Sequence, residues 1–223
     1  MTRTAIVTGG TGGLGSAVTA ALLDAGWHVV VPWVTEAELE RLRAHERLTL
    51  VRADLLDEDG PAAVVAAADG RLDALVNLVG GFAQPGLVDE APVAEFERML
   101  RLNLVPTYAV TAAALPLLLD GGGAVVCTAA NAALHPFPGA SGYLVAKRGV
   151  LAFVDVLHAE YGERGIVASA LLPTVIDTPA NREAMPDADP SEWQRPADLA
   201  ATVLDLVGDP AGERRATVHV PGA

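Results

Sequence analysis

Two patterns of apolar residues alternate along the whole chain: short apolar runs, and longer stretches in which apolar residues recur at helical spacing. The runs predict strands near residues 3–8, 28–32, 48–53, 73–78, 123–128, 166–171 and 216–220. The stretches between them predict helices near residues 13–25, 36–45, 60–68, 92–119, 141–162 and 196–208. This alternation predicts an α/β fold in which a doubly wound parallel sheet is covered by helices on both faces.

The chain has 223 residues, which suits one domain, 1–223, with a sizeable core. We find no internal repeat and no low-complexity tract. One long segment, 172–195, lacks a periodic pattern and contains Pro173, Pro179, Pro186 and Pro190. Because ordered loops of this length are usually functional, we expect residues 172–195 to form a flap over a binding site.

Composition narrows the classes of partner. Hydrophobic residues make up 51% of the chain, but no uninterrupted apolar run reaches the ~18 residues that suggest a membrane span. The formal net charge of −13 argues against nucleic acid or an anionic membrane surface as a partner, because both require basic patches. The first predicted strand leaves no room for a signal peptide before it, so we expect a cytoplasmic protein.

We expect neither a disulfide within the chain nor a metal site. Cys127 is the only cysteine, so a disulfide within the chain is impossible. Its position in an apolar strand predicts a buried packing role. We single out no set of metal ligands.

A glycine cluster, Thr8–Gly15, separates the first predicted strand from the first predicted helix. Glycines let the backbone approach a pyrophosphate closely, and the free amides and positive dipole end of the helix attract its charge. A flexible turn is the alternative explanation. The order of strand, glycine turn and helix favours a Rossmann-type dinucleotide site.

Lys147 is the only lysine; the fourteen other basic residues are arginine. It follows Tyr143 by four residues at the predicted start of a helix, so the two side chains would face each other across one helical turn. A compact ammonium stabilises a phenolate and would lower the pKa of the tyrosine from about 10 toward the range of a general acid or base. An accidental pair on a solvated face is the alternative.

Further motifs occur at characteristic spacings along nearly the whole chain. The pattern Thr-Gly-x-x-x-Gly-x-Gly from Thr8, followed far downstream by Tyr-x-x-x-Lys, resembles the short-chain dehydrogenase/reductase family. Further family motifs appear in order: Asp54-Leu55, Asn77-Leu-Val-Gly80, Asn103 in a long helix, and Pro173-Thr-Val-Ile176-Asp-Thr178.

The resemblance implies a mechanism. Tyr143 would exchange a proton with a carbonyl or alcohol oxygen while a nicotinamide exchanges hydride with the carbon. Lys147 would bind the nicotinamide ribose and keep Tyr143 acidic, and Asn103 would hold a water that links Lys147 to solvent. For Asn103 the alternative is a polar residue that satisfies a helix kink near Pro106.

The resemblance also implies which residues contact the cofactor. These are Thr8, Gly9, Thr11, Gly13, Leu14, Gly15, Asp54, Leu55, Asn77, Gly80, Tyr143, Lys147, Pro173, Ile176 and Thr178. NAD users of the family commonly carry Asp at the end of the second strand, and NADP users carry Arg there or in the glycine loop. Neither signature is present. The missing arginine favours NAD over NADP, with Thr35 or Glu36 as the ribose hydroxyl partner and Trp33 either beside the adenine or simply packed.

One family residue is missing. The family carries a serine thirteen residues before the tyrosine, where it hydrogen-bonds to the developing oxyanion, and here that position is Ala130. Losing one such donor costs about 2.7–4 kcal/mol in a preorganised site. Either Thr128, Asn131 or Ser141 replaces it, or the reaction does not need it.

A narrower resemblance offers a second explanation. The loop Leu172–Asp189 and the segment Gly80-Gly81-Phe82 are similar to those of dihydropteridine reductases, which also have Ala at the serine position and reduce a pterin ring. Three functions follow: a carbonyl reductase or alcohol dehydrogenase, a reductase of a pterin or imine ring, and a redox-inactive nucleotide-binding sensor or structural protein. Joint retention of Tyr143, Lys147 and Asn103 argues against the last.

Substrate and assembly are the remaining expectations. We expect a small-molecule substrate contacted by Ala130, Asn131, His135 and Phe137, with aromatic residues lining an apolar pocket for a ring. Arg182 would bind an anionic substrate group or pair with Asp187 and Asp189. The family resemblance implies a homodimer or homotetramer that pairs the helices near 92–119 and 141–162, although these would equally serve as core helices.

Overall fold

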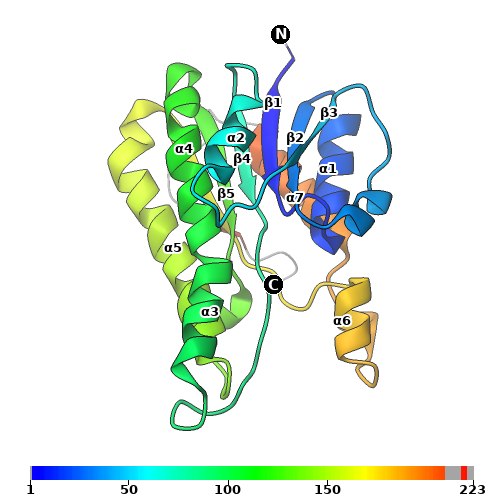
Figure 1. Cartoon of the computed structure of the whole chain (residues 1–223), viewed down its shortest axis with the longest axis vertical. Coiled ribbons are helices and arrows are strands. Elements are labelled where there is room, and N and C mark those ends of the chain that lie inside the picture. The colour runs from blue at the N-terminus through cyan, green and yellow to red at the C-terminus, as the bar shows by residue number, and fades with distance from the viewer. Residues whose placement is uncertain (1, 209–216, 220–223) are drawn as a thin grey trace.

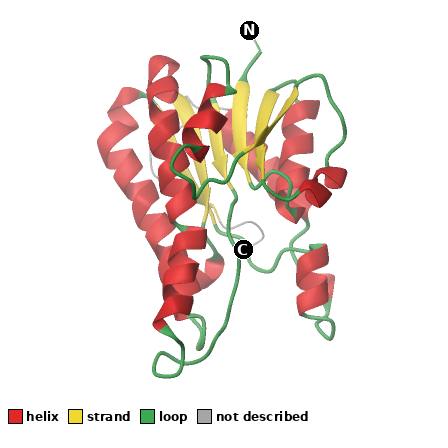
Figure 2. Ribbon diagram, in the orientation of Figure 1, coloured by secondary structure: helices red, strands yellow, loops and turns green. Residues whose placement is uncertain are grey.

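The computed structural model describes residues 2–208 and 217–219, and its strands form one parallel sheet (Figure 2). The strands are β1 (Thr4–Thr8), β2 (His28–Trp33), β3 (Leu48–Arg52), β4 (Ala74–Asn77), β5 (Gly123–Thr128), β6 (Ile166–Leu171) and β7 (Thr217–His219). Their order across the sheet is β3-β2-β1-β4-β5-β6-β7, and all neighbours are parallel. The predicted doubly wound parallel sheet is confirmed.

Helices cover both faces of this sheet (Figure 1). The α-helices are α1 (Gly13–Asp24), α2 (Gly60–Ala66), α3 (Val93–Asn103), α4 (Val105–Gly121), α5 (Ser141–Tyr161), α6 (Pro179–Ala184) and α7 (Pro196–Gly208). Short 3-10 helices are η1 (Glu36–Arg41), η2 (Asn131–Ala133), η3 (Gly162–Arg164) and η4 (Pro190–Glu192). α1 and α7 pack together on one face, whereas α2, α4 and α5 cover the other.

The central strands are mostly apolar because both of their faces are buried. Successive side chains of a strand point to opposite sides of the sheet. In β5, Val125 and Cys127 join the core beneath α4 and α5, whereas Ala124 and Val126 join the core beneath α1 and α7. The packing role predicted for Cys127 is confirmed, since its side chain is fully buried.

The single helix predicted over 92–119 is wrong, because this segment forms two helices. α3 ends at Asn103 and α4 begins at Val105. Pro106 accounts for the break, because proline has no N–H to donate and its ring obstructs the preceding turn. Asn103 satisfies the end of α3: its Nδ2 donates to the carbonyl of Met99 at 3.1 Å.

Two further segments differ from their predicted structure. The helix predicted over 36–45 is the shorter 3-10 helix η1. The segment 172–195, predicted to be irregular, contains α6 and η4. Pro179 and Pro190 begin these two short helices, where the missing N–H costs nothing.

Taken together, α3 and α4 span Val93–Gly121, a segment that is long and apolar enough to cross a membrane, judged by length and composition alone. In the fold, its α4 part packs against α2 and the strands β4 and β5. Val110, Ala114 and Leu118 of α4 are fully buried there. This is the packing of a helix that covers a sheet.

The strand order reverses beside β1. The chain passes from β1 to β2 and β3 on one side, and then crosses to β4 on the other. In sheets of this kind, ligands bind in the crevice outside the carboxyl ends of the strands at the reversal. The turns after β1 and β4 are therefore the expected place for a site.

The crossing of α5 over α3 gives a test of the packing. A Cβ at Gly142 would lie 2.9 Å from Cα of Phe96 and 3.0 Å from Cβ of Met99. We expect Gly142→Ala to lower the free energy of unfolding in urea by about 1–3 kcal/mol, the usual cost of overpacking. Gly121→Ala is the control, because no atom outside its own helix backbone lies within 4 Å of that Cβ position. Equal losses in both variants would contradict this packing.

Candidate active site

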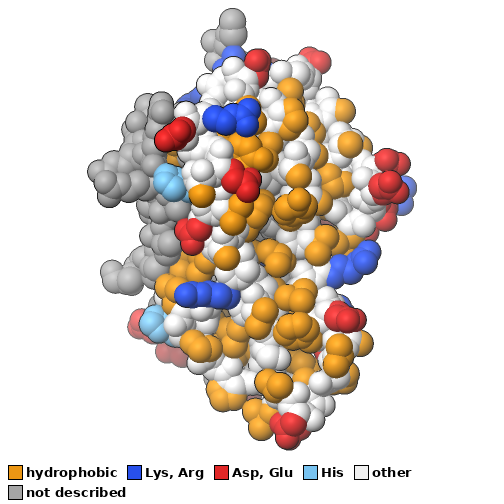
Figure 3. All heavy atoms as spheres, turned by 90° about the vertical axis from the view of Figure 1, so that its left-hand side faces the viewer, with side chains coloured by type: hydrophobic (Ala, Val, Ile, Leu, Met, Phe, Trp, Pro, Cys, Tyr) orange, Lys and Arg blue, Asp and Glu red, His pale blue; other side chains and the backbone are white. Residues whose placement is uncertain are grey.

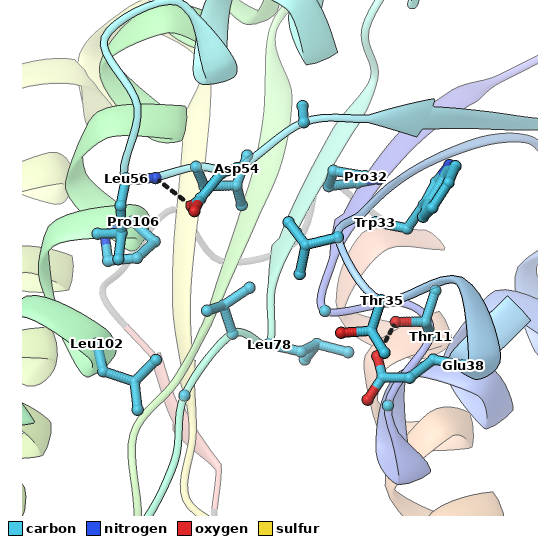
Figure 4. A pocket seen from close by; sticks show the side chains of 17 residues that line it. Thr11, Pro32, Trp33, Thr35, Glu38, Asp54, Leu56, Leu78, Leu102 and Pro106 are labelled. Atoms are coloured by element: carbon cyan, nitrogen blue, oxygen red, sulfur yellow. Dashed lines mark hydrogen bonds between the residues drawn. The ribbon is translucent and has the colours of Figure 1, made fainter.

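A cavity of about 480 Å³ opens at the carboxyl ends of β1, β2, β3 and β4 (Figure 4). We call it the main cavity. Residues predicted to hold a cofactor line its wall: Gly9, Thr11, Asp54, Leu55 and Gly80. The cavity therefore lies where the strand order reverses, at the expected position.

The glycine turn leaves the N-terminus of α1 free to bind a ligand. Gly9 has φ +67°, and a Cβ at Gly15 would lie 1.9 Å from the carbonyl oxygen of Gly9, so only glycine permits this packing. α1 follows Gly12 with no side-chain cap and no acidic residue in its first turn. Its free amides and positive dipole end fit the pyrophosphate of a dinucleotide.

Glu38 on η1 is a cavity residue that the sequence analysis missed. Its Oε2 accepts a hydrogen bond from the Thr11 hydroxyl at 2.6 Å, so the carboxylate stands against the glycine turn (Figure 4). Arg41 lies 3.2 Å from Glu38 Oε1 and donates to the Thr11 carbonyl at 3.1 Å. Of the two predicted ribose partners, Thr35 lines the cavity, whereas Glu36 is exposed on η1.

The part of the cavity between β2 and β3 fits a flat base. Asp54 Oδ1 accepts a hydrogen bond from the Leu56 amide at 2.9 Å, which fixes the turn after β3. Trp33 lines the cavity beside this turn, with the Arg52 guanidinium 5.8 Å from the indole centroid. Leu55 adds a second apolar wall.

The side chains of Thr8 and Asn77 lie inside the sheet rather than on the cavity wall. Asn77 Nδ2 donates to Thr111 Oγ1 at 3.1 Å, and the Thr8 hydroxyl accepts from the Leu78 amide at 3.2 Å. Both residues are almost fully buried. These two side chains tie β1, β4 and α4 together where the cavity begins, and the cofactor contact expected of Thr8 and Asn77 stays a prediction.

The ammonium of Lys147 lies at the inner end of the cavity. A Cβ at Gly80, on the cavity wall, would lie 3.0 Å from Lys147 Nζ and 2.6 Å from Asn103 Oδ1. Lys147 is 5% exposed and donates to the Thr128 carbonyl at 2.9 Å. α5 carries Tyr143 one turn earlier, so the phenol and the ammonium lie on the same face of this helix.

Asn103 fixes the turn that borders Lys147. Its Oδ1 accepts a hydrogen bond from the Gly81 amide at 3.0 Å, while its Nδ2 donates to Met99 at the end of α3. The side chain is fully buried. Asn103 therefore has the kink-satisfying contact considered for it, and the water relay stays a prediction.

Burial shifts the pKa values of the two titrating groups in opposite directions. The pKa of Lys147 falls from 10.5 to about 8, because the ammonium loses hydration. The pKa of Tyr143 rises above 10.0, because the phenolate would lose hydration as well. The expected lowering of the tyrosine pKa by Lys147 is wrong for the protein without cofactor: desolvation is the stronger effect.

Ala130 is buried. The three residues considered as substitutes for the missing serine differ in their surroundings. The Thr128 hydroxyl is buried and has no hydrogen-bond partner among the residues that the structure describes. The backbone N–H of Asn131 donates to the Pro173 carbonyl at 2.9 Å and so ties η2 to the start of the flap. Ser141 is the first residue of α5. Thr128 thus has a buried hydroxyl without a partner among the described residues.

The segment before α5 brings an aromatic ring near Tyr143. His135 and Phe137 are both exposed in this segment. The ring of Phe137 lies 6.3 Å from that of Phe82, which lies 5.1 Å from that of Tyr143. Phe82 was absent from the predicted site, because only the folded chain shows that the turn after β4 reaches α5.

The flap 172–195 lies against the glycine turn. Ile176 pairs with Gln194 at its base. A Cβ at Gly13 would lie 2.7 Å from the methyl group of Thr178, whose hydroxyl accepts from the Asn181 amide and caps α6. The side chain of Leu14 packs into the core beneath α1 and α7, and its predicted cofactor contact stays a prediction.

Arg182 has a different partner from those expected. It pairs with Asp177 rather than with Asp187 or Asp189, and its Nη2 lies 2.9 Å from Asp177 Oδ2. The pair holds the pKa of the Asp177 carboxyl below its usual value. The guanidinium is therefore engaged within the flap.

Comparisons with known proteins identify the family of the chain. The chain matches the family model for short chain dehydrogenases over residues 3–189. It is 32% identical to 2-(R)-hydroxypropyl-CoM dehydrogenase of Xanthobacter autotrophicus, over 96% of this chain and 92% of the relative. It is 34% identical to 2-dehydro-3-deoxy-L-rhamnonate dehydrogenase (NAD(+)) of a Sphingomonas species, over 79% and 73%. The crystal structure of levodione reductase matches with a TM-score of 0.88 and 28% identity, over 98% and 95%.

These relatives are named dehydrogenases and reductases, and the match extends over most of each chain. The main cavity, the open N-terminus of α1 and the Tyr143–Lys147 turn of α5 are what such enzymes need to hold a dinucleotide beside a proton donor. The chain therefore belongs to the short-chain dehydrogenase/reductase family and is an NAD(P)-dependent oxidoreductase.

Proposed function

We propose that the protein transfers hydride between NAD(P) and a small carbonyl or alcohol compound, with Tyr143 as proton donor and acceptor. One observation carries this proposal: the cavity wall reaches Gly80, which lies against the buried ammonium of Lys147, one helical turn from Tyr143. The glycine turn anchors a dinucleotide at the other end of this wall. When bound, the nicotinamide supplies hydride for reduction or accepts it in oxidation.

In reduction, the carbonyl carbon gains the hydride and the oxygen gains the proton of Tyr143, so the C=O double bond becomes C–OH. Tyr143 then regains a proton from solvent. Because burial raises its pKa, the phenol is protonated at neutral pH, which is the form that a general acid needs. Oxidation requires the phenolate instead.

Lys147 acts by binding and orienting. An ammonium has three hydrogen-bond donors, of which the Thr128 carbonyl uses one. We propose that the others bind the nicotinamide ribose hydroxyls. Asn103 would support this contact by fixing the turn at Gly81, and a water held by its side chain would complete the path of protons from solvent.

Ala130 supports a second candidate reaction. Without a hydroxyl at this position, the site lacks the usual donor to a developing oxyanion. Reduction of a pterin or imine ring places the new proton on nitrogen and makes less demand on that donor. Turnover of quinonoid dihydropterin but not of ketones would decide for this candidate.

We propose NAD rather than NADP as the cofactor. The carboxylate of Glu38 stands on the cavity wall with Thr35, where it would accept a hydrogen bond from a ribose 2′-hydroxyl and repel a 2′-phosphate. Arg41, the neighbouring cation, is already engaged by Glu38 and the Thr11 carbonyl. The Sphingomonas relative is named as an NAD(+) enzyme, which supports this choice.

We also propose that a second copy of the chain covers the outer faces of α4 and α5 in a homodimer or homotetramer. Apolar side chains gather on this side of the molecule (Figure 3). Val105, Tyr108, Val145 and Val156 are each between 44% and 60% exposed. Exposed apolar patches of this kind mark interaction surfaces.

Removing the hydroxyl of Tyr143 tests the proposed chemistry. We expect Tyr143→Phe to lower kcat for ketone reduction by about 10²- to 10⁴-fold, the usual contribution of proton transfer. The Kd for NADH, followed by nicotinamide fluorescence, should stay nearly unchanged. Tyr161→Phe, at the far end of α5, is the control and should keep full activity. Full activity of Tyr143→Phe would remove this residue from the mechanism.

The burial of Lys147 predicts how stability depends on pH. Between about pH 8 and 10.5 the folded protein has released this proton while the unfolded chain still holds it, so the free energy of unfolding should rise with pH by up to about 3 kcal/mol. Urea denaturation at about pH 7 and 9.5 should show this rise in the wild type and in Arg148→Met, whose arginine is exposed. Lys147→Met should lack it. Parallel pH profiles in all three proteins would show that Lys147 is not desolvated.

Neutralising Glu38 tests the cofactor preference. We expect Glu38→Gln, which keeps a side chain able to bond to Thr11, to shift the ratio of NADH to NADPH affinity about tenfold toward NADPH, because it removes a charge beside the 2′ position. Fluorescence titration with both nucleotides measures the ratio. Glu36→Gln makes the same charge change at the exposed position. Equal shifts in both variants, or none in Glu38→Gln, would refute the assignment.

A further inference from the structure

Two phenylalanines stand exposed beside Tyr143. Phe82 is 58% exposed and Phe137 is 38% exposed. The ring of Phe82 meets that of Tyr143 edge-on, with centroids 5.1 Å apart and planes at 84°, and lies 6.3 Å from the ring of Phe137. Exposed aromatic surface therefore continues directly from the proposed proton donor.

The two segments that carry these rings are tied to each other. Gln84 Nε2 donates to the Pro138 carbonyl at 3.0 Å, and the Gly86 amide donates to the Gly139 carbonyl at 3.3 Å. Gly139 has φ +90°, and a Cβ there would lie 3.0 Å from Gln84 Cγ, so the segments pack closely. The two segments that carry the rings are thus joined before a ligand arrives, which reduces the entropy cost of binding.

The same two segments carry no formal charge at neutral pH. Neither residues 78–88 nor residues 128–146 contain Asp, Glu, Lys or Arg. The two cations of the flap, Arg182 and Arg195, are engaged by Asp177 and Asp198. A carboxylate or phosphate on the substrate would find no counter-charge in these segments, whereas apolar surface would gain from leaving water.

From this arrangement we infer that the substrate is an uncharged compound with a flat ring next to its carbonyl or carbinol carbon, and that Phe82 and Phe137 bind that ring. Aromatic rings prefer edge-on or offset contacts at centroid distances of about 4.5–7 Å, which these side chains already adopt. Phe82 is then a specificity-determining residue, since it contacts both the ring and Tyr143. The inference rests on the proposed function for the role of Tyr143.

The test compares a ring ketone, 1-tetralone, with 2-decanone, an open-chain ketone of the same carbon number, and with the anion 2-oxooctanoate. We expect the wild type to reduce 1-tetralone with a kcat/KM at least about tenfold above the other two. Phe82→Ala should lower kcat/KM for 1-tetralone about tenfold more than it lowers kcat/KM for 2-decanone, with the difference mainly in KM. Phe82→Leu, which keeps apolar bulk without a ring, should lose most of the preference. Val88→Ala, at an 82% exposed position of the same segment, should keep it.

Binding of 2-naphthol to the cofactor-free protein, measured by calorimetry, separates this inference from the proposed function. If Phe82→Ala weakens 2-naphthol binding about tenfold while no variant reduces a ketone, the ring site stands and the proposed redox chemistry falls. If ring and open-chain ketones are reduced equally well, and Phe82→Ala changes neither their ratio nor the Kd of 2-naphthol, the ring site is overturned and the proposed function stands.

Discussion

The site depends on the burial of one ammonium group. Lys147 is 5% exposed, and the loss of hydration lowers its pKa to about 8. The Thr128 carbonyl at the end of β5 offsets part of this cost by accepting a hydrogen bond, and Gly80 leaves room for Nζ because it has no side chain. β4, β5 and α5 must therefore meet at one point, which is the point where the main cavity ends.

A parallel sheet provides such a meeting point because its strands all end at the same edge. The glycine turn, the Gly80 turn and the flap follow β1, β4 and β6, and polar side chains fix the turns from within. Asn77 joins β4 to α4, and Asn103 joins the Gly81 amide to the end of α3. The helix break near Pro106 is part of this arrangement, because it ends α3 where Asn103 can reach Gly81.

The fold and the centre of the site were predictable, because they depend on short-range patterns. A strand buried on both faces is apolar along its length, and a four-residue spacing on a helix places Tyr143 and Lys147 one turn apart. The partners and burial of the polar side chains were not predictable. Glu38 accepts a hydrogen bond from Thr11 because η1 passes beside the glycine turn in the folded chain. Asn77 donates to Thr111 inside the fold. The predicted direction of the Tyr143 pKa shift was wrong. Desolvation depends on how the side chain packs in the folded protein, and residue spacing does not reveal that packing.

Because the chain contains a single lysine, its ammonium can be measured directly. In protein labelled with ¹³C at the lysine side chain, one NMR resonance reports Lys147. The account predicts that this resonance titrates at about pH 8 in the cofactor-free protein and shifts when NADH is added. A titration near 10.5, the ordinary value for lysine, with no response to NADH would show a hydrated ammonium away from the cavity and would contradict the account.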